Sequence, residues 1–185
     1  MKLNSSKISC CRTILTISHD PLFLCFLPFT VLSGLFAIAA AKHGYLDIFA
    51  EEMVNIIDLS EQGNTFAEFY ELDKSFEKER SRQLWSGAGY LGTIYKGLFG
   101  MDFQQGGIAF SPNKIEGKDG ELKMNETISL LNIKYRNAIL DIYVTGSGSN
   151  VTSFRLNGEV QKVAEIDGWV TGRQLIEIEV APFKS

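Results

Sequence analysis

One stretch in the first half of the chain combines a carboxylate with a cluster of aromatic side chains. Glu68 stands among Phe66, Phe69 and Tyr70, and Trp85 opens an apolar segment after a run rich in charge. Neighbouring rings desolvate a carboxylate and shift its pKa, which suits general acid–base chemistry beside a binding surface lined by rings. The plainer interpretation is that Glu68 is a surface residue of a loop and that Trp85 is a core anchor at the start of a helix.

Patterns typical of metal sites are absent from the sequence. The two histidines, His19 and His43, lie far from any pair of cysteines, and the three cysteines are Cys10, Cys11 and Cys25. No Cys-x-x-Cys or His-Glu-x-x-His spacing occurs, so we expect neither a metal nor a cofactor. The net charge is −4 with both signs interspersed. No basic stripe results, and nucleic acid is not an expected partner.

The composition is that of a globular protein, with an apolar run near the N-terminus. The chain has 185 residues, 45% hydrophobic and 22% charged, enough for one ordinary domain or two small ones. Residues 21–41 carry no charge and approach the roughly 20 residues that span a bilayer. One interpretation is a signal peptide or anchor, which predicts export or membrane anchoring. The other is a buried helix of a larger all-helical domain, and the long charged flank, Asp20 and the interruptions at Pro28 and Gly34 count against the signal peptide.

Two helices are predicted ahead of the aromatic cluster. The periodicity of residues 35–59 indicates a helix pair, the first ending at Gly44. In the second helix, acidic residues lie largely opposite the apolar face or near the start, and they complement the helix dipole. The predicted apolar face comprises Leu46, Phe49, Met53, Ile56 and Ile57, and the acidic residues are Asp47, Glu51 and Glu52.

A third helix is predicted after the charged run, from about residue 82 to residue 99. Its apolar residues recur at steps of three and four, and Gly100 is expected to end it. Three internal glycines each lower helix propensity by roughly 1 kcal/mol relative to alanine, which fits a helix packed closely against its neighbours. The expected apolar face is Leu84, Ala88, Leu91, Tyr95 and Leu98, and the glycines are Gly87, Gly89 and Gly92.

Beyond Gly100 the hydrophobic period changes from 3.6 to 2, which predicts strands. We expect a short strand in GGIAFSP, a turn near Arg136-Asn137 and a hairpin at Asn157-Gly158. Near the C-terminus, Ile176, Ile178 and Val180 alternate with Glu177 and Glu179, typical of a half-buried antiparallel strand. Trp169 is expected to pack at the edge of this small antiparallel β unit, and a boundary is expected near residues 100–106.

The order of these features resembles the C-terminal end of the six-hairpin (α/α)6-barrel glycosidases, the superfamily of trehalase and the processing α-glucosidases. The similarity covers residues from about 33 to 185. Glu68, Tyr70 and Glu71 fit the Glu-x-Tyr motif of the late barrel, Trp85-Ser86 with Gly87-Ala88 fit the start of the next helix, and GGIAFSP fits the strand after the barrel. Phe69 replaces a polar residue common in the motif, and the charged insertion through Arg80 is long.

The resemblance implies α and β parts in series, with N-terminal helical hairpins of a partial (α/α)6 toroid followed by a small antiparallel β-sandwich. The implied division is an unassigned segment at residues 1–32, barrel helices at 33–102 and the β domain at 103–185. Six hairpins make twelve helices, and this chain supplies three or four. It therefore resembles the tail of an enzyme whose front is missing.

The implied function is that part of an inverting glycoside hydrolase acting on α-linked glycosides. By the family match Glu68 is the general base, and Tyr70, Trp85 and Phe69 contact the substrate. The general acid belongs to earlier barrel sequence that this chain lacks, so the chain alone is expected to be inactive. The implied partners are an oligosaccharide or disaccharide substrate and the missing N-terminal part of the barrel.

Two other functions remain open at this point. One is a non-catalytic β module that binds carbohydrate or protein and is tethered by membrane contact through residues 21–41. The other is a phosphorolytic relative in the same superfamily, which uses phosphate as the nucleophile and needs no base carboxylate. A role for Glu68 would argue against this second alternative.

Overall fold

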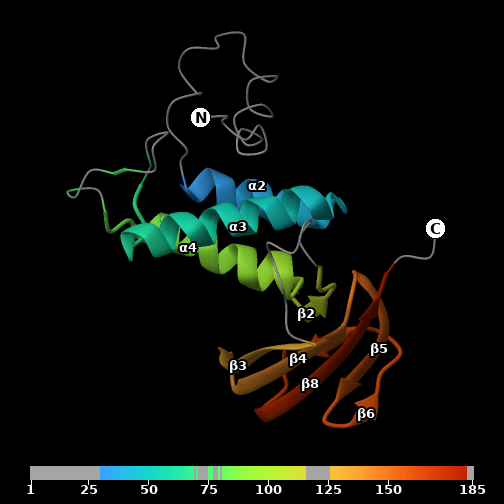
Figure 1. The fold of residues 1–185 in the computed structure, drawn as a ribbon. Helices are drawn as coiled ribbons and strands as arrows, with labels where there is room; N and C mark the ends of the chain where they lie inside the picture. The colour runs from blue at the N-terminus through green and yellow to red at the C-terminus, as the bar shows by residue number, and fades with distance from the viewer. Residues whose placement is uncertain are drawn as a thin grey trace.

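The chain folds as helices followed by strands, which confirms the predicted α and β parts in series (Figure 1). The computed structural model describes residues 30–68, 70, 75–76, 79, 81–115 and 126–182. Within them, helical segments come first and two β-sheets follow. The helical segments are α2 (Thr30–Lys42), α3 (Leu46–Gly63), α4 (Leu84–Gly92) and the π-helix η3 (Thr93–Leu98).

Helix α2 accounts for the described part of the apolar run, and it packs in the protein core. Ala37, Ala40 and Ala41 are all buried there, and Gly44 ends the helix with a φ of 76°, as predicted. None of the described helices combines the length and apolar character that crossing a bilayer requires. Residues 21–29, the rest of the apolar run, lie outside the described residues.

Helix α3 packs through the face that its periodicity predicts. Phe49, Met53 and Ile56 are buried, and Leu46 and Ile57 are partly buried against the same cluster. The expectation for one acidic residue was wrong, because Glu52 is also buried, with 3% of its surface exposed. It directly precedes Met53 on the helix, so its side chain lies at the border of the buried face.

Helices α2 and α4 run parallel to each other and touch through glycine. A Cβ on Gly34 would lie 2.8 Å from the Gly89 Cα, and one on Gly92 would lie 3.1 Å from the Ile38 side chain. Gly34 faces Gly89, and Ile38, further along α2, faces Gly92, further along α4. The two helices are therefore parallel neighbours. The hydroxyl of Thr93, in the π-helix that continues α4, also donates to the Gly34 carbonyl of α2, at 3.4 Å. The close packing that the glycines predicted is therefore confirmed.

The apolar face predicted for the third helix was wrong in its N-terminal half, whereas Leu98 is buried and Tyr95 partly buried, as predicted. Leu84 is 90% exposed and Leu91 is 48% exposed, whereas Ser86 and Gly89 are buried. The physical reason is the backbone contact with α2, which admits only small side chains on that side. The bulky residues must then point away from α2.

The strands form two sheets, a three-stranded sheet in the order β1-β2-β7 and a five-stranded sheet in the order β3-β4-β8-β5-β6. The turn at Arg136-Asn137 and the hairpin at Asn157-Gly158 form as predicted, with positive φ at Arg136, Asn157 and Gly158. The strands are β1 (Met101–Phe103), β2 (Gly107–Phe110), β3 (Thr127–Tyr135), β4 (Ala138–Gly146), β5 (Asn150–Leu156), β6 (Glu159–Val160), β7 (Glu165–Asp167) and β8 (Gly172–Ala181).

The β unit is not purely antiparallel, contrary to the prediction. Strand β8 pairs antiparallel with β5 but parallel with β4, in a register that places Ile142 opposite Ile176. The chain leaves the five-stranded sheet after β6, adds β7 to the other sheet, and then returns as β8. The alternation predicted for β8 is confirmed, because Ile176, Ile178 and Val180 are all buried.

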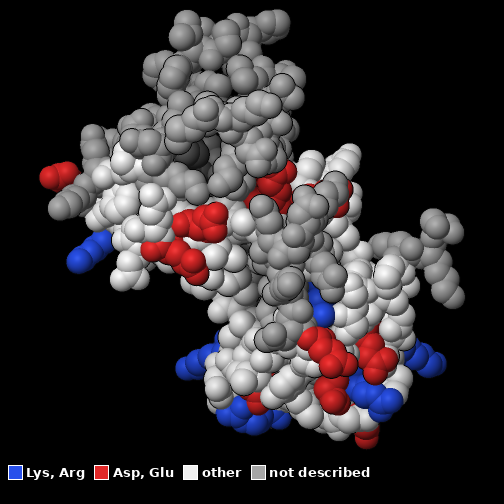
Figure 2. Space-filling view, viewed as in Figure 1, with Lys and Arg blue, Asp and Glu red and all other residues white. Residues whose placement is uncertain are grey.

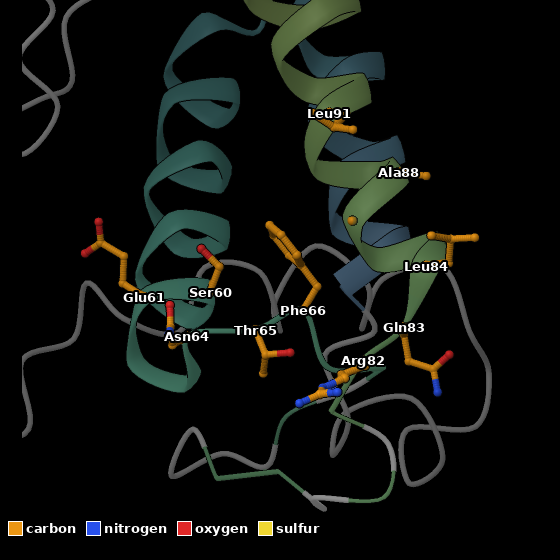
Figure 3. Close-up of a pocket in the computed structure, with 11 residues that line it drawn as sticks. Ser60, Glu61, Asn64, Thr65, Phe66, Arg82, Gln83, Leu84, Ala88 and Leu91 are labelled. Atoms are coloured by element: carbon orange, nitrogen blue, oxygen red, sulfur yellow. The ribbon is translucent and has the colours of Figure 1, made fainter.

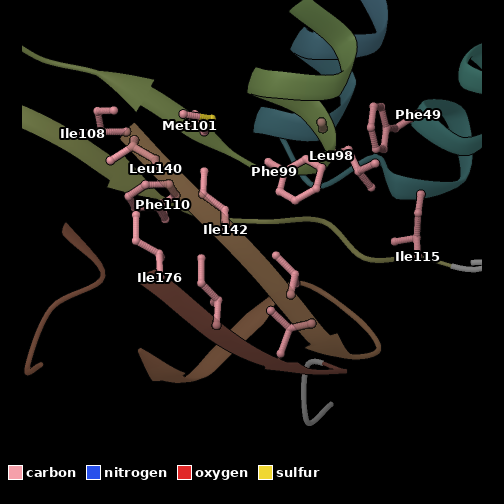
Figure 4. Packing of buried hydrophobic residues seen from close by; sticks show 14 of the residues in the cluster. Phe49, Leu98, Phe99, Met101, Ile108, Phe110, Ile115, Leu140, Ile142 and Ile176 are labelled. Atoms are coloured by element: carbon pink, nitrogen blue, oxygen red, sulfur yellow. The ribbon is translucent and has the colours of Figure 1, made fainter. Parts of the chain in front are cut away.

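One hydrophobic cluster joins the helices to both sheets (Figure 4). Phe49 lies against Gly97 at the end of the helical part, where an added Cβ would come within 2.6 Å of its ring. The predicted domain boundary, between residues 102 and 103, falls inside β1. The division of the chain into domains stays a prediction. The cluster includes Leu98 and Phe99 from the helical end, Met101, Ile108 and Phe110 from the small sheet, and Leu140, Ile142 and Ile176 from the large sheet.

Candidate functional site

The loop between α3 and α4 carries the residues predicted to do chemistry. Glu68 is half-buried in this loop, and Tyr70 is buried with 1% of its surface exposed. Trp85 lies in the first turn of α4 and is 54% exposed. Phe69 and Glu71 lie outside the described residues.

Tyr70 supports the backbone of this loop. Its hydroxyl accepts a hydrogen bond from the Ala67 N–H at 3.3 Å and donates to the Thr65 carbonyl at 3.2 Å. Its ring meets the ring of Phe76 edge-on, with 5.4 Å between centroids. Because the hydroxyl and ring are both engaged within the protein, Tyr70 holds the loop in shape, and its predicted contact with a substrate stays a prediction.

A hollow of about 670 Å³ lies between the C-terminal end of α3 and the N-terminal half of α4 (Figure 3). Phe66 points into the space between the two helices, and its ring packs against Tyr90 with 5.1 Å between centroids. The lining combines an apolar floor with polar residues at the rim. The lining residues are Ser60, Glu61, Asn64, Thr65, Phe66, Arg82, Gln83, Leu84, Gly87, Ala88 and Leu91.

The predicted site residues are not part of this lining. Glu68, Tyr70 and Trp85 come from the same loop and helix start, but none of them borders the hollow. The acidic residue that does border it is Glu61, and the basic residue is Arg82. Glu68 therefore lies two residues after Phe66, which lines the hollow, but does not itself border it.

Acidic side chains dominate the nearby helix surface. Helix α3 contains Asp and Glu but neither Lys nor Arg, and acidic side chains gather over it, whereas both signs cover the five-stranded sheet (Figure 2). Within the described ranges, no group of three His, Cys, Asp or Glu side chains is arranged to hold a metal ion. The side chains that line the hollow supply carboxylate, amide, hydroxyl and guanidinium groups and an aromatic ring.

Sequence reasoning missed the hollow because it assigned the wrong face of α4 to the core. Leu84, Ala88 and Leu91 were expected to be buried, and they instead form one wall of the hollow. The signal that indicates the correct face is the spacing of Ser86, Gly89 and Thr93, small residues at steps of three and four.

Comparison with known proteins assigns no family to the chain. No protein-family model matches it, and none of the curated proteins matches it significantly.

Proposed function

We propose that this chain is the C-terminal part of an inverting glycoside hydrolase of the six-hairpin type, acting on α-linked glycosides. In this proposal Glu68 is the general base, and the chain is inactive until the rest of the barrel is supplied. The observation that supports the proposal is the arrangement of α2, α3 and α4, in which α2 and α4 lie parallel and α3 runs antiparallel to them.

In an (α/α)6 toroid, helices alternate between an inner and an outer layer, so helices two apart along the chain are parallel neighbours. Helices α2 and α4 have this relation through the contact of Gly34 with Gly89. Helix α3 runs the opposite way, because its start meets Gly97 through Phe49 and the loop after its end meets Gly87 through Phe66. Its acidic outer face suits the outer layer, and the almost wholly apolar α2 suits the inner one.

The outward faces of α2 and α4 are apolar, which supports a missing neighbour on either flank. Leu32 and Leu35 of α2 are 49% and 57% exposed, and Leu84 of α4 is 90% exposed. Soluble proteins rarely leave such clustered apolar surface in contact with water unless another element covers it. Further hairpins of a ring would cover both faces.

The two sheets support a sandwich as the trailing domain. Phe110 of the small sheet and Phe154 of the large sheet bring their rings to 5.6 Å between centroids. Apolar residues of both sheets belong to one cluster, as the facing layers of a sandwich require. We therefore propose a sandwich in which the sheet order is mixed rather than antiparallel throughout.

The proposed mechanism needs two carboxyl groups on opposite sides of the glycosidic bond, roughly 6.5–9.5 Å apart. Glu68, ionised, holds and deprotonates the attacking water, and the missing part of the barrel supplies the acid that protonates the leaving oxygen. Trp85 offers an exposed ring at the same end of the helical part for the apolar face of a sugar. Each acid or base group contributes about 10²–10⁴-fold, so a chain without its acid is expected to be inactive.

The test begins with the DNA upstream of the coding sequence, which is expected to encode earlier barrel helices. Co-expression of that polypeptide with this chain should produce hydrolysis of trehalose or aryl α-glycosides with inversion at the anomeric carbon. Glu68→Gln should lower kcat by about 10²-fold or more. Glu79→Gln, a change of the same kind at an exposed residue of the same loop, should leave kcat unchanged.

Three outcomes would contradict the proposal. Hydrolysis by this chain alone would show that no missing part is needed. Full activity of the Glu68→Gln complex would remove the base role from this residue. Loss of activity in Glu61→Gln instead would transfer that role to the carboxylate that borders the hollow.

A further inference from the structure

Trp169 projects from the β part with 84% of its surface exposed, contrary to the expectation that it packs at a sheet edge. The turn beneath it is fixed by hydrogen bonds. The Trp169 N–H donates to the Asp167 carboxylate at 2.7 Å, and the Gly168 N–H donates to the Gly106 carbonyl at 2.7 Å. The backbone that carries the exposed indole is therefore fixed by these hydrogen bonds.

Arg136 ties this turn to two others. Its Nη1 donates to the Gly168 carbonyl at 3.2 Å, and its Nη2 donates to the Gln105 carbonyl at 3.2 Å. The guanidinium carbon lies 5.3 Å from the centroid of the Tyr135 ring, a distance that allows a cation–π contact. A Cβ at position 168 would come within 2.1 Å of Arg136 Nη1, so a larger residue there would displace the guanidinium.

A second ring adjoins Tyr135. Phe103 is 50% exposed, and its ring centroid lies 6.3 Å from that of Tyr135. The three-turn platform consists of Phe103 of β1, Tyr135 of β3, Arg136 of the turn after β3 and Trp169 of the turn after β7; the third turn is the one at Gln105, whose carbonyl Arg136 also binds. Trp169 directly follows Gly168, whose carbonyl accepts a hydrogen bond from Arg136, so an exposed ring and a guanidinium with hydrogen-bond donors belong to neighbouring, tied turns.

We propose that the three-turn platform is a carbohydrate-binding subsite, in which a pyranose stacks on Trp169 and its hydroxyls accept hydrogen bonds from Arg136. A guanidinium has five N–H donors, and two of them serve the carbonyls of Gly168 and Gln105. The remaining donors are available to ligand hydroxyls. Pyranose rings present an apolar C–H face and an equatorial ring of hydroxyls, which suits an exposed indole on a turn whose backbone carbonyl is bound by a guanidinium.

The exposed surface at the platform favours a saccharide over a protein partner. A stable protein interface buries about 800 Å² on each side, with a hydrophobic centre. Around Trp169 the adjoining exposed residues are instead polar, namely Gln104, Gln105 and Asp167. One stacked ring with a few hydrogen bonds predicts a weak dissociation constant, on the order of 1 mM.

This subsite is separate from the proposed hydrolytic site. Trp85 opens α4, whereas Phe103 follows η3, so the combined length of α4 and η3 separates the two. The proposed sugar binding does not depend on the proposed hydrolase activity, because the experiment measures binding alone and the binding residues belong to the β part.

The chain has two tryptophans, which makes a direct test available. In a Trp85→Phe background, Trp169 is the only indole, and the proposed barrel ring is removed at the same time. Titration with maltose, cellobiose, mannobiose and xylobiose should give a saturable change in indole emission with at least one of them. Isothermal titration calorimetry on the otherwise unchanged chain should give a matching dissociation constant.

Substitutions then assign the binding to the platform. Trp169→Ala should weaken binding at least about tenfold in calorimetry, and Arg136→Lys should weaken it while leaving the Trp169 emission of the sugar-free chain unchanged. Val163→Ala, at an exposed apolar residue of the same β part, is the matched control and should bind like the parent. Circular dichroism confirms that each variant is folded.

The inference is overturned if no sugar gives a saturable response at about ten times the expected dissociation constant. It is also overturned if Trp169→Ala binds as well as the parent chain. Emission that changes with protein concentration instead of sugar would assign the platform to self-association and would equally overturn it.

Discussion

In the loop between α3 and α4, a single side chain fixes the path of the backbone. Tyr70 was predicted as a substrate contact, yet its hydroxyl bridges Ala67 and Thr65. Sequence alone did not reveal this, because a loop hydrogen bond depends on the path of the backbone and not on residue spacing. The aromatic cluster was visible in the sequence, but which of its members face solvent was not.

Tyr70→Phe tests this supporting role. Removal of the hydroxyl leaves two backbone groups without their partner, so the free energy of unfolding should fall by about 1–2 kcal/mol. Urea denaturation followed by circular dichroism measures it. Unchanged stability would mean that the hydroxyl is free to serve a ligand.

An exposed network on the large sheet predicts a pH dependence. The Asn132 N–H donates to Asp141 at 2.9 Å, and Arg173 donates to both Asp141 and the Asn132 side chain. The backbone N–H of Asn132 first, and Arg173 second, hold the pKa of Asp141 below its ordinary value of 3.8. Because the folded pKa is lowered, the stabilisation is present above pH 3.8 and is lost as the pH falls through the folded value.

Asp141→Asn should therefore lower the denaturation midpoint at neutral pH, and the difference from the parent should shrink as the pH drops below 3.8. At low pH the protonated Asp141 and the amide are both neutral, which is why the two proteins converge. Midpoints in urea at several pH values measure this. A difference that stays constant down to acid pH would show that the charge of Asp141 does not matter.

At the scale of elements, glycine decides how the helices pack. The sequence predicted three helices, their approximate ends and the close packing of the third, because each of these depends on local pattern. It did not predict which side of α4 is buried. The hydrophobic pattern favoured the face that carries Leu84 and Leu91, because leucine is more hydrophobic than serine or glycine. The contact with Gly34 instead requires small residues, and the buried face carries Ser86 and Gly89.

Gly34→Ala and Gly87→Ala should have opposite effects on stability. A Cβ at Gly34 would lie 2.8 Å from the Gly89 backbone, so the helices must separate, at a cost of about 1–3 kcal/mol. A Cβ at Gly87 would meet only the Phe66 ring, at 3.6 Å, and the gain in helix propensity, about 1 kcal/mol, should prevail. Thermal unfolding measures both. Equal effects of the two variants would contradict the glycine contact.

At the scale of the whole molecule, one core connects two parts that the sequence presents as separate. The change of period beyond Gly100 correctly located the passage from helices to strands. Contacts between distant segments leave no local signal, and so neither the cluster that Phe49 shares with the sheets nor the parallel pairing of β8 was predicted.

Phe49→Ala should destabilise the helical and β parts together. The lost burial and the cavity against Gly97 predict a decrease of about 3–5 kcal/mol in the free energy of unfolding. Leu84→Ala, at a residue with 90% exposure, should change it by less than about 0.5 kcal/mol. With both substitutions made in a Trp85→Phe background, far-ultraviolet circular dichroism and Trp169 emission should report one coincident transition in each protein. Two separate transitions would show that the parts fold independently.

The position of β8 in the large sheet has a consequence for how the chain acquires its shape. This strand follows all the other described strands in sequence, yet it occupies the middle of the sheet, between β4 and β5. During synthesis on a ribosome, β8 emerges after the β3–β4 and β5–β6 hairpins, which it joins. Until then we expect the side chains of Leu140, Ile142 and Phe154, buried in the fold, to be exposed to water. Insertion of β8 forms contacts between residues far apart in the chain, so we expect it to be a slow step of folding. While the chain waits for β8, its exposed apolar residues can cause aggregation, and chaperones can bind them.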